Sequence, residues 1–468
     1  MKYISTRSNA PALSFEDVVL QGLALDGGLY VPEFLPKLDE NKIAQMRHMT
    51  YEEIFFEVTE HFIAGEIDSD TYKKIIAKSY KNFSHSGIAP LKQLSQNEFL
   101  LELFHGPTLA FKDFALQFLG NLLDYLLQKR SEKIVIIGAT SGDTGSAAIQ
   151  GCKACANASI FILHPHNRVS EVQRKQMTTV LSDNVFNIAL EGNFDDCQSM
   201  VKKMFVDQKF LNGKRMVAVN SINFARIMAQ IVYYFYAASR LGVNAQTPIS
   251  FSVPTGNFGD IYAGYLSKKM GLNIKTLIIA TNANDILHRF LQNNDYSRAD
   301  AKDTISPSMN IQVSSNFERL LFDAYKEQKS EEKLSELMKE FERTGFLKAD
   351  HEVLQNIKKD FDSYAFDDKQ TSEKIKEVFA KTGEVLDPHT AIGVAASNEF
   401  IKNKSYSGEL VVTLATAHPA KFPESVVEAT GKNPELPNFM KDLFSCPEKM
   451  EVIINSVESV KKFISERI

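Results

Sequence analysis

Three short segments contain residue types that could bind or transform a small anionic ligand. Lys112 follows Phe111 and precedes a phenylalanine-rich stretch. Two glycine-rich segments, residues 141–145 and 256–259, each follow an apolar run. A lysine with a lowered pKa can act as a nucleophile and a proton carrier, and glycine-rich turns at helix starts direct backbone N–H groups toward anions. Each segment also fits a structural role, as a solvated lysine on an amphipathic helix or as a tight turn.

The two glycine-rich segments would suit different anions. Residues 256–259 read Gly-Asn-Phe-Gly and open a helical stretch, where a phosphate could bind backbone N–H groups without a basic side chain. Their spacing matches neither the dinucleotide fingerprint nor the Walker pattern. In residues 141–145, the hydroxyls of Ser141 and Thr144 would suit a carboxylate. Asp143 could also be a first-turn acid that favours the helix dipole.

An alternation of strands and helices must position these segments. From about residue 98, short apolar runs predict buried parallel strands that are followed by turns and helical stretches. The clearest predicted strands are residues 133–137, 159–163, 249–253 and 409–414. In open α/β sheets, ligands bind beyond the carboxyl ends of the strands, so we expect the chemistry in the loops that follow these four runs.

Two other regions are predicted to be mostly helical. Near the N-terminus, capping boxes that begin at Ser14 and Thr50 predict two helix starts. Residues 326–381 are rich in Lys and Glu, which together with one apolar face predicts a helical insertion. The residues of that face are Leu334, Leu337, Met338 and Phe341.

Composition and charge exclude several classes of protein. The chain has 468 residues, enough for two or three domains with sizeable cores. Its 53 Lys and Arg against 58 Asp and Glu give a net charge of −5, so we expect neither a nucleic-acid partner nor a membrane surface. Residues 1–20 lack the apolar region of a secretory signal, and the apolar stretch 227–238 is too short to span a membrane.

The cysteines and histidines give no sign of a metal site. Four cysteines are too few for a disulfide framework in a chain of this length, so we expect a cytoplasmic protein. Cys152 and Cys155 have redox-motif spacing, but no second cysteine pair accompanies them. No histidines have HExxH spacing, and we interpret His105, His389 and His418 as positioning residues at most.

The segment around Lys112 resembles the cofactor-lysine motif of the threonine synthases, which are pyridoxal-phosphate enzymes of the tryptophan-synthase-β (type II) fold. Residues 1–7, 22–32, 220–226 and 315–319 also resemble segments of that family's longer, bacterial and fungal branch. The resemblance implies an α/β protein with two open twisted α/β domains. The expected parts are an N-terminal, mostly helical extension (1–97), a catalytic α/β region (98–325), the helical insertion (326–381) and a C-terminal part that completes the large cofactor-binding domain (382–468).

The resemblance also implies roles for individual residues. Lys112 would bond to the aldehyde of pyridoxal 5'-phosphate, and Thr416 would face its pyridine nitrogen. A neutral threonine there makes the ring a weaker electron sink than an aspartate would, which suits eliminations and replacements. The residues expected to bind the cofactor are Lys112, Phe111, Gly256, Asn257, Phe258, Gly259, Asp260 and Thr416.

The implied reaction converts O-phospho-L-homoserine and water into L-threonine and phosphate. Lys112 would move protons at the substrate carbons, phosphate would leave from Cγ and water would add at Cβ. A second anion site must then bind the substrate phosphate, and the basic residues of 168–174 are candidates if they are not merely a solvated helix start. The residues expected to bind the substrate are Ser141, Gly142, Asp143, Thr144, Arg168, Ser170, Arg174 and Asn223, and Arg226 is a weaker candidate.

Asp143 departs from the wider fold group, which usually has an asparagine at this position. An ionised carboxylate only accepts hydrogen bonds and would repel the phenolic oxygen of the cofactor. Asp143 must therefore be protonated, directed away or used as a first-turn acid, and we expect it to be directed away. Two other functions remain possible: another type II lyase, such as a dehydratase or β-replacement enzyme, and a catalytically silent homologue that binds the phosphorylated ligand. We expect a monomer or homodimer.

Overall fold

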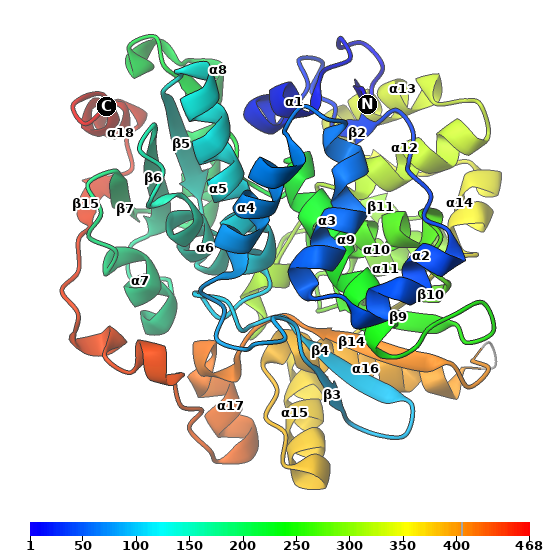
Figure 1. Ribbon diagram of the computed structural model, residues 1–468. Helices are drawn as coiled ribbons and strands as arrows, with labels where there is room; N and C mark the ends of the chain where they lie inside the picture. Colours follow the sequence, from blue (N-terminus) through cyan, green and yellow to red (C-terminus); the bar gives the residue numbers. More distant parts are fainter. Residues whose placement is uncertain (404–405) are drawn as a thin grey trace.

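Two open, mostly parallel sheets form the frame of the protein (Figure 1). The computed structural model describes residues 1–403 and 406–468. The six-stranded sheet has the order β13-β10-β9-β14-β4-β3, and only β3 runs antiparallel to its neighbour. Its strands are β3 (Leu91–Gln93), β4 (Glu98–Glu102), β9 (Ile249–Pro254), β10 (Ile274–Thr281), β13 (Phe361–Ala365) and β14 (Leu410–Ala415).

The second sheet has five parallel strands in the order β15-β7-β6-β5-β8. Its strands are β5 (Ile134–Ala139), β6 (Ala158–Pro165), β7 (Val185–Glu191), β8 (Arg215–Val217) and β15 (Glu451–Ile454). The four runs predicted as buried parallel strands correspond to β5, β6, β9 and β14. Their apolar continuity follows from burial on both faces, because helices cover both sides of a parallel sheet. The α/β prediction is therefore confirmed.

The N-terminal region packs helices onto the central part of the molecule. Ser14 caps α1 through its hydroxyl, and Thr50 and Glu53 form a complete capping box on α3, so both predicted helix starts are confirmed. Helix α3 packs against α9, and α4 packs against α5. The elements of this region are β1 (Tyr3–Ser5), α1 (Phe15–Gln21), β2 (Tyr30–Pro32), α2 (Glu40–Gln45), α3 (Tyr51–Ile63) and α4 (Ser69–Tyr80).

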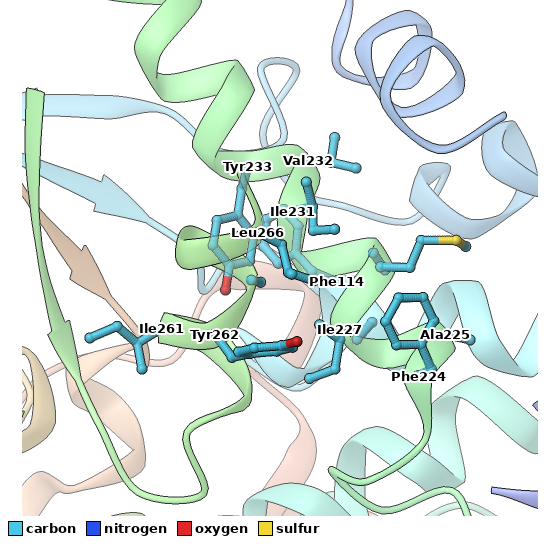
Figure 2. Packing of buried hydrophobic residues seen from close by; sticks show 14 of the residues in the cluster. Phe114, Phe224, Ala225, Ile227, Ile231, Val232, Tyr233, Ile261, Tyr262 and Leu266 are labelled. Carbon is cyan, nitrogen blue, oxygen red and sulfur yellow. The ribbon is translucent and has the colours of Figure 1, made fainter. Parts of the chain in front are cut away.

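Helices α5 (Lys112–Arg130), α9 (Phe224–Arg240) and α10 (Gly259–Lys269) form the centre of the hydrophobic core. Figure 2 shows side chains of all three helices packed together, with Phe114 beside Tyr233. The two rings meet edge to face with centroids 6.0 Å apart. Because Phe114 is two residues from Lys112, this packing anchors the first turn of α5, at which Lys112 lies.

Other helices surround the two sheets and are α6 (Asp143–Cys152), α7 (Glu171–Thr178), α8 (Phe194–Val206), α11 (Ile286–Asn293), α12 (Phe317–Glu327), α13 (Glu332–Thr344), α14 (His351–Ile357), α15 (Asp368–Thr382), α16 (Pro388–Lys402), α17 (Pro423–Thr430) and α18 (Val457–Ser465). Helix α16 packs on β14, β9 and β10. Helix α10 also packs on β9 and β10. Short elements complete the chain: β11 (Tyr296–Ser297), β12 (Phe346–Leu347), η1 (Met46–His48), η2 (Lys209–Leu211), η3 (Pro307–Met309), η4 (Pro419–Lys421), η5 (Asn438–Met440) and η6 (Leu443–Ser445).

Two expectations about the parts of the chain need correction. Residues 326–381 form helices α13, α14 and α15, but they also contain β13, which pairs in parallel with β10 in the larger sheet. The segment is therefore integrated into the frame rather than purely helical. The C-terminal part does not only complete the larger domain, because β15 pairs with β7 in the smaller sheet. Strand pairing over such sequence distances depends on packing, which local patterns do not reveal.

Candidate active site

Lys112 lies at the start of α5, beside the carboxyl end of β14. The backbone before it pairs with the segment after β14, because Phe111 N–H donates to Thr416 O at 2.8 Å and His418 N–H donates to Leu109 O at 3.0 Å. This pairing brings Lys112 and Thr416 together, as the loop rule for α/β sheets predicts. The Lys112 ammonium also lies 4.9 Å from the centre of the Phe111 ring.

The Asp143 carboxylate faces Lys112. Lys112 Nζ lies 3.3 Å from Asp143 Oδ2 and 3.4 Å from Ser308 Oγ. Our expectation that Asp143 is directed away is therefore wrong. Burial lowers the pKa of Lys112, because desolvation disfavours the ammonium more than Asp143 stabilises it, and the Lys421 charge acts in the same direction as burial.

Asp143 is almost completely buried and accepts hydrogen bonds on both oxygens. Gln173 Nε2 donates to Oδ1 at 2.9 Å, and Ser308 Oγ donates to Oδ2 at 2.8 Å. Lys421 Nζ lies 2.9 Å from Oδ1. Desolvation opposes ionisation, but the charges of Lys421 and Lys112 and the smaller effects of His389 and Gln173 prevail, so the pKa of Asp143 is well below its ordinary value. Asp143 is therefore an ionised acceptor.

The glycine-rich turn that opens α10 exposes backbone donors. Among the described residues, the N–H groups of Asn257, Phe258 and Gly259 donate to no protein acceptor. Phe258 adopts a left-handed conformation with φ 65°, while its side chain is fully buried. A Cβ on Gly256 would lie 2.9 Å from Ser308 O, so only glycine lets the Ser308 loop approach. The turn thus combines free N–H groups with a helix N-terminus, as an anion site requires.

Arg226 adds a buried positive charge near this turn. Its side chain is buried, and its Nε atom has no hydrogen-bond partner among the described residues. Nη1 donates to Val219 O at 3.2 Å, and no described carboxylate forms an ion pair with the guanidinium. Asp260, in the first turn of α10, is also buried, and desolvation raises its pKa to about 6. A buried guanidinium with an unused donor is suited to an anionic ligand.

The Ser141 segment forms a second turn with free backbone donors. Thr140 Oγ1 accepts from the N–H groups of Gly142 and Gly145, both at 2.9 Å. The N–H groups of Ser141, Asp143 and Thr144 donate to no acceptor in the described chain. Gly142 has φ 142°, and a Cβ there would come 2.5 Å from the Gln173 side chain. This turn can therefore bind a second, smaller anion at the start of α6.

The residues predicted to bind the substrate phosphate differ in whether their side chains already have protein partners. Arg168 is exposed and has no ion pair among the described residues. Ser170 caps α7 by accepting from Gln173 N–H, and Arg174 pairs with Glu448. Asn223 is fully buried, caps α9, and donates to Val19 O at 2.9 Å and Ala218 O at 3.2 Å. Arg174 and Asn223 thus have protein partners already.

Three residues that contact the site were not expected from the sequence: Ser308, Gln173 and Lys421. Gln173 is one turn beyond Ser170, and Lys421 is five residues beyond Thr416, so both follow predicted strands. Ser308 lies in η3, outside every predicted strand end. Its N–H donates to His389 Nε2 at 3.2 Å, and His389 Nδ1 lies 2.8 Å from Asp387 Oδ1. His389 therefore positions the Ser308 loop.

The residues present fit pyridoxal phosphate. The buried lysine with its lowered pKa suits the aldehyde, and the turn at 256–259 together with Arg226 suits the phosphate. Thr416 is buried, its N–H donates to Thr390 Oγ1 at 3.2 Å, and its own hydroxyl has no partner among the described residues. No described group of three or more His, Cys, Asp or Glu could hold a metal ion. Among the residues described, no helix is long and apolar enough to cross a membrane.

Comparisons with known proteins agree with this assignment. Residues 2–80, 85–351 and 390–464 match the families described as threonine synthase N terminus, pyridoxal-phosphate dependent enzyme, and threonine synthase, C-terminal. A threonine synthase of Pseudomonas aeruginosa is 56% identical over 467 residues, covering 100% of this chain and 98% of its own.

Two solved structures share the whole fold. A pyridoxal-phosphate-bound threonine synthase from Brucella melitensis has a TM-score of 0.96 and 46% identity, covering 100% of this chain and 99% of its own. The yeast threonine synthase has a TM-score of 0.94 and 40% identity, covering 100% of this chain and 98% of its own. This chain therefore belongs to the threonine synthase family and is a pyridoxal-phosphate-dependent lyase.

Proposed function

We propose that the protein converts O-phospho-L-homoserine and water into L-threonine and phosphate, the last step of threonine biosynthesis. One observation carries the proposal: a buried lysine of lowered pKa contacts Asp143, in one turn with free backbone N–H groups, and Ser308, whose loop packs against a second such turn at Gly256. The proposed substrate has a carboxylate and a phosphate, and the cofactor has a phosphate of its own. The site must therefore bind several anions, which a chain with a net charge of −5 can do only locally.

Lys112 is the proposed cofactor-bonding residue and proton carrier. When bound, pyridoxal phosphate supplies an electron sink that makes protons near the substrate's amino-bearing carbon acidic. Burial favours the neutral amine of Lys112, which can accept a proton from Cα and from Cβ, return one at Cγ and, after water has added at Cβ, return one at Cα. Ser308 Oγ, 3.4 Å from Lys112 Nζ, helps to orient the amine. Thr416 would hydrogen-bond the pyridine nitrogen as a neutral partner.

The anionic groups are assigned by the donors available. We assign the substrate carboxylate to the free N–H groups and hydroxyls of Ser141 and Thr144, with Gly142 shaping the turn. We assign the cofactor phosphate to the turn at 256–259 with Arg226. The substrate phosphate is assigned to the N-terminus of α7, with Arg168 as its basic side chain. Support for this last assignment comes from Gln173 in the first turn of α7, which reaches Asp143 and so brings that helix start beside Lys112.

The test is threonine formation from O-phospho-L-homoserine by the purified protein supplied with pyridoxal phosphate. Lys112→Ala is expected to abolish threonine formation and the visible absorption band of the lysine-bound cofactor. Lys129→Ala is the matched control, because Lys129 lies at the other end of α5 and pairs with Glu16 at the surface. This control should keep both activity and absorption band.

The alternatives give different results in the same assay. If the cofactor band forms but no threonine appears, the substrate assignment fails and another type II amino-acid substrate is indicated. If the band forms and no amino acid is turned over, the protein is a silent binding homologue. A Lys112→Ala protein as active as its parent would refute the role of Lys112. A cytoplasmic location and a monomeric or homodimeric state remain our predictions.

A further inference from the structure

Lys421 is a buried lysine that lies beside the site without taking part in the proposed reaction. It ends η4, and its side chain has no exposed area. Its ammonium donates to Thr108 O at 2.6 Å and to Gln176 Oε1 at 2.8 Å, and it lies 2.9 Å from Asp143 Oδ1. Two of the three N–H donors of the ammonium therefore have acceptors, and the ion pair with Asp143 is a third contact. These acceptors fix the position of the charge.

The contact with Lys421 determines which oxygen of Asp143 faces Lys112. Oδ1 accepts from Gln173 and forms the ion pair with Lys421, whereas Oδ2 accepts from Ser308 and faces Lys112. Because Oδ1 is held on one side, Oδ2 remains directed at Lys112 Nζ. Lys421 also neutralises the charge of Asp143, which would otherwise have Lys112 as its only ion-pair partner among the described residues.

Lys421 also joins the parts of the chain that surround the site. It follows β14 of the larger sheet, and it reaches α6 and α7, which pack around the smaller sheet. Through Thr108 it holds the loop before Lys112. Thr108 in turn donates its N–H and its hydroxyl to Asp113, at 2.7 and 2.8 Å. A change at Lys421 therefore acts on both Lys112 and Asp143.

We propose that Lys421 is a positioning residue for Lys112, because it holds the Asp143 carboxylate ionised and aligned while leaving the Lys112 nitrogen free to lose its proton. Without Lys421, the full charge of Asp143 would stabilise a proton on that nitrogen. The other charged or titratable groups that act on Lys112 or Asp143 are Arg226 on α9, Asp260 on α10 and His389 on α16. They are the same in the parent and in a Lys421 variant.

The test is a pH titration of the holoenzyme, followed by the visible absorption band of the lysine-bound cofactor. The inference rests on the proposed function only for the bond between the cofactor and Lys112, and the titration needs no substrate. Loss of a cation next to Asp143 should raise the titration midpoint of Lys421→Met by about 1–3 pH units. Lys175→Met is the matched control, because Lys175 is also well buried but contacts Phe444 O, Cys446 O and Glu448 instead. Its midpoint should not move.

Repeating the titration in an Asp143→Asn protein tests whether Lys421 acts on Lys112 through Asp143. In Asp143→Asn, the charge that Lys421 neutralises is absent, so adding Lys421→Met should shift the midpoint by less than half as much. This double variant removes both members of the buried Lys421–Asp143 ion pair, so neither of them is left without its partner, and it remains measurable if Lys421→Met does not fold. An unchanged midpoint with a lower melting temperature would overturn the proposal in favour of a purely structural role. An equal shift in both backgrounds would overturn the part assigned to Asp143.

Discussion

The close packing of α5 on α6 makes Gly120→Ala a sharp test of how the site is positioned. Lys112 begins α5 and Asp143 begins α6, and the two helices meet again at Gly120 and Gly151 (Figure 1). A Cβ on Gly120 would lie 2.0 Å from Gly151 O. Real contacts of this kind are longer than 3.0 Å, so the helices must separate by about 1 Å.

The expected free-energy change has the opposite sign to that given by helix propensity. In an exposed helix, replacing a mid-helix glycine by alanine stabilises by about 1 kcal/mol. Overpacking costs about 1–3 kcal/mol, and the clash here involves backbone atoms that cannot rotate away. With the cost at the upper end of this range, about 3 kcal/mol, and about 1 kcal/mol returned by helix propensity, we expect a net loss of about 2 kcal/mol in the free energy of unfolding, seen as a melting temperature lower by a few degrees.

The loss of kcat in Gly120→Ala should be large compared with its small loss of folding stability. A displacement of about 1 Å between Lys112 and Asp143 can cost about 100-fold in kcat, because proton transfer depends on the position of the donor and acceptor. The control is Gly138→Ala, where the nearest atom to the new Cβ is the flexible Ile162 Cδ1 at 3.3 Å. A Gly120→Ala protein that melts at or above the parent temperature with unchanged kcat would refute the reasoning.

Three further predictions concern single residues. Desolvation raises the pKa of Asp113 to about 6, so its stabilising contribution is complete below the unfolded pKa and is lost as the pH rises through about 6. The free energy of unfolding of Asp113→Asn, measured with urea, should therefore rise by about 3 kcal/mol relative to that of the parent between pH 4 and 7. Parallel plots of the two free energies against pH would contradict this. Arg226→Gln should weaken pyridoxal phosphate binding at least about tenfold in an absorption titration, since it removes a charged donor, and equal affinity would exclude Arg226 from the phosphate site. Arg168→Ala should raise the KM for O-phospho-L-homoserine about tenfold or more with a smaller change in kcat, and an unchanged KM would refute its assignment.

Much of the frame is predictable because its signals are local. Continuous apolar runs mark β5, β6, β9 and β14, and the segments after these strands contain most of the residues assigned to the cofactor and the substrate, although Lys112 and Arg226 lie elsewhere. The capping boxes at Ser14 and Thr50 mark helix starts because the capping atoms are three residues apart. Lys112 was identified by its resemblance to a family motif, since its spacing alone fits an ordinary surface lysine.

The tertiary structure decided what lies around Lys112. Asp143 faces Lys112 rather than away from the site, because Lys421 and Ser308, 278 and 165 residues away in the chain, contact its two oxygens. Strand β13 joins the larger sheet from a segment predicted to be helical, and β15 joins the smaller sheet from a segment assigned to the larger domain. The sequence by itself determined most of the elements, through periodicity and local hydrogen bonding, and it identified the reactive lysine through its resemblance to a family motif. The ionisation and direction of Asp143 were decided only by folding, since they depend on charges that distant segments bring into one water-poor space.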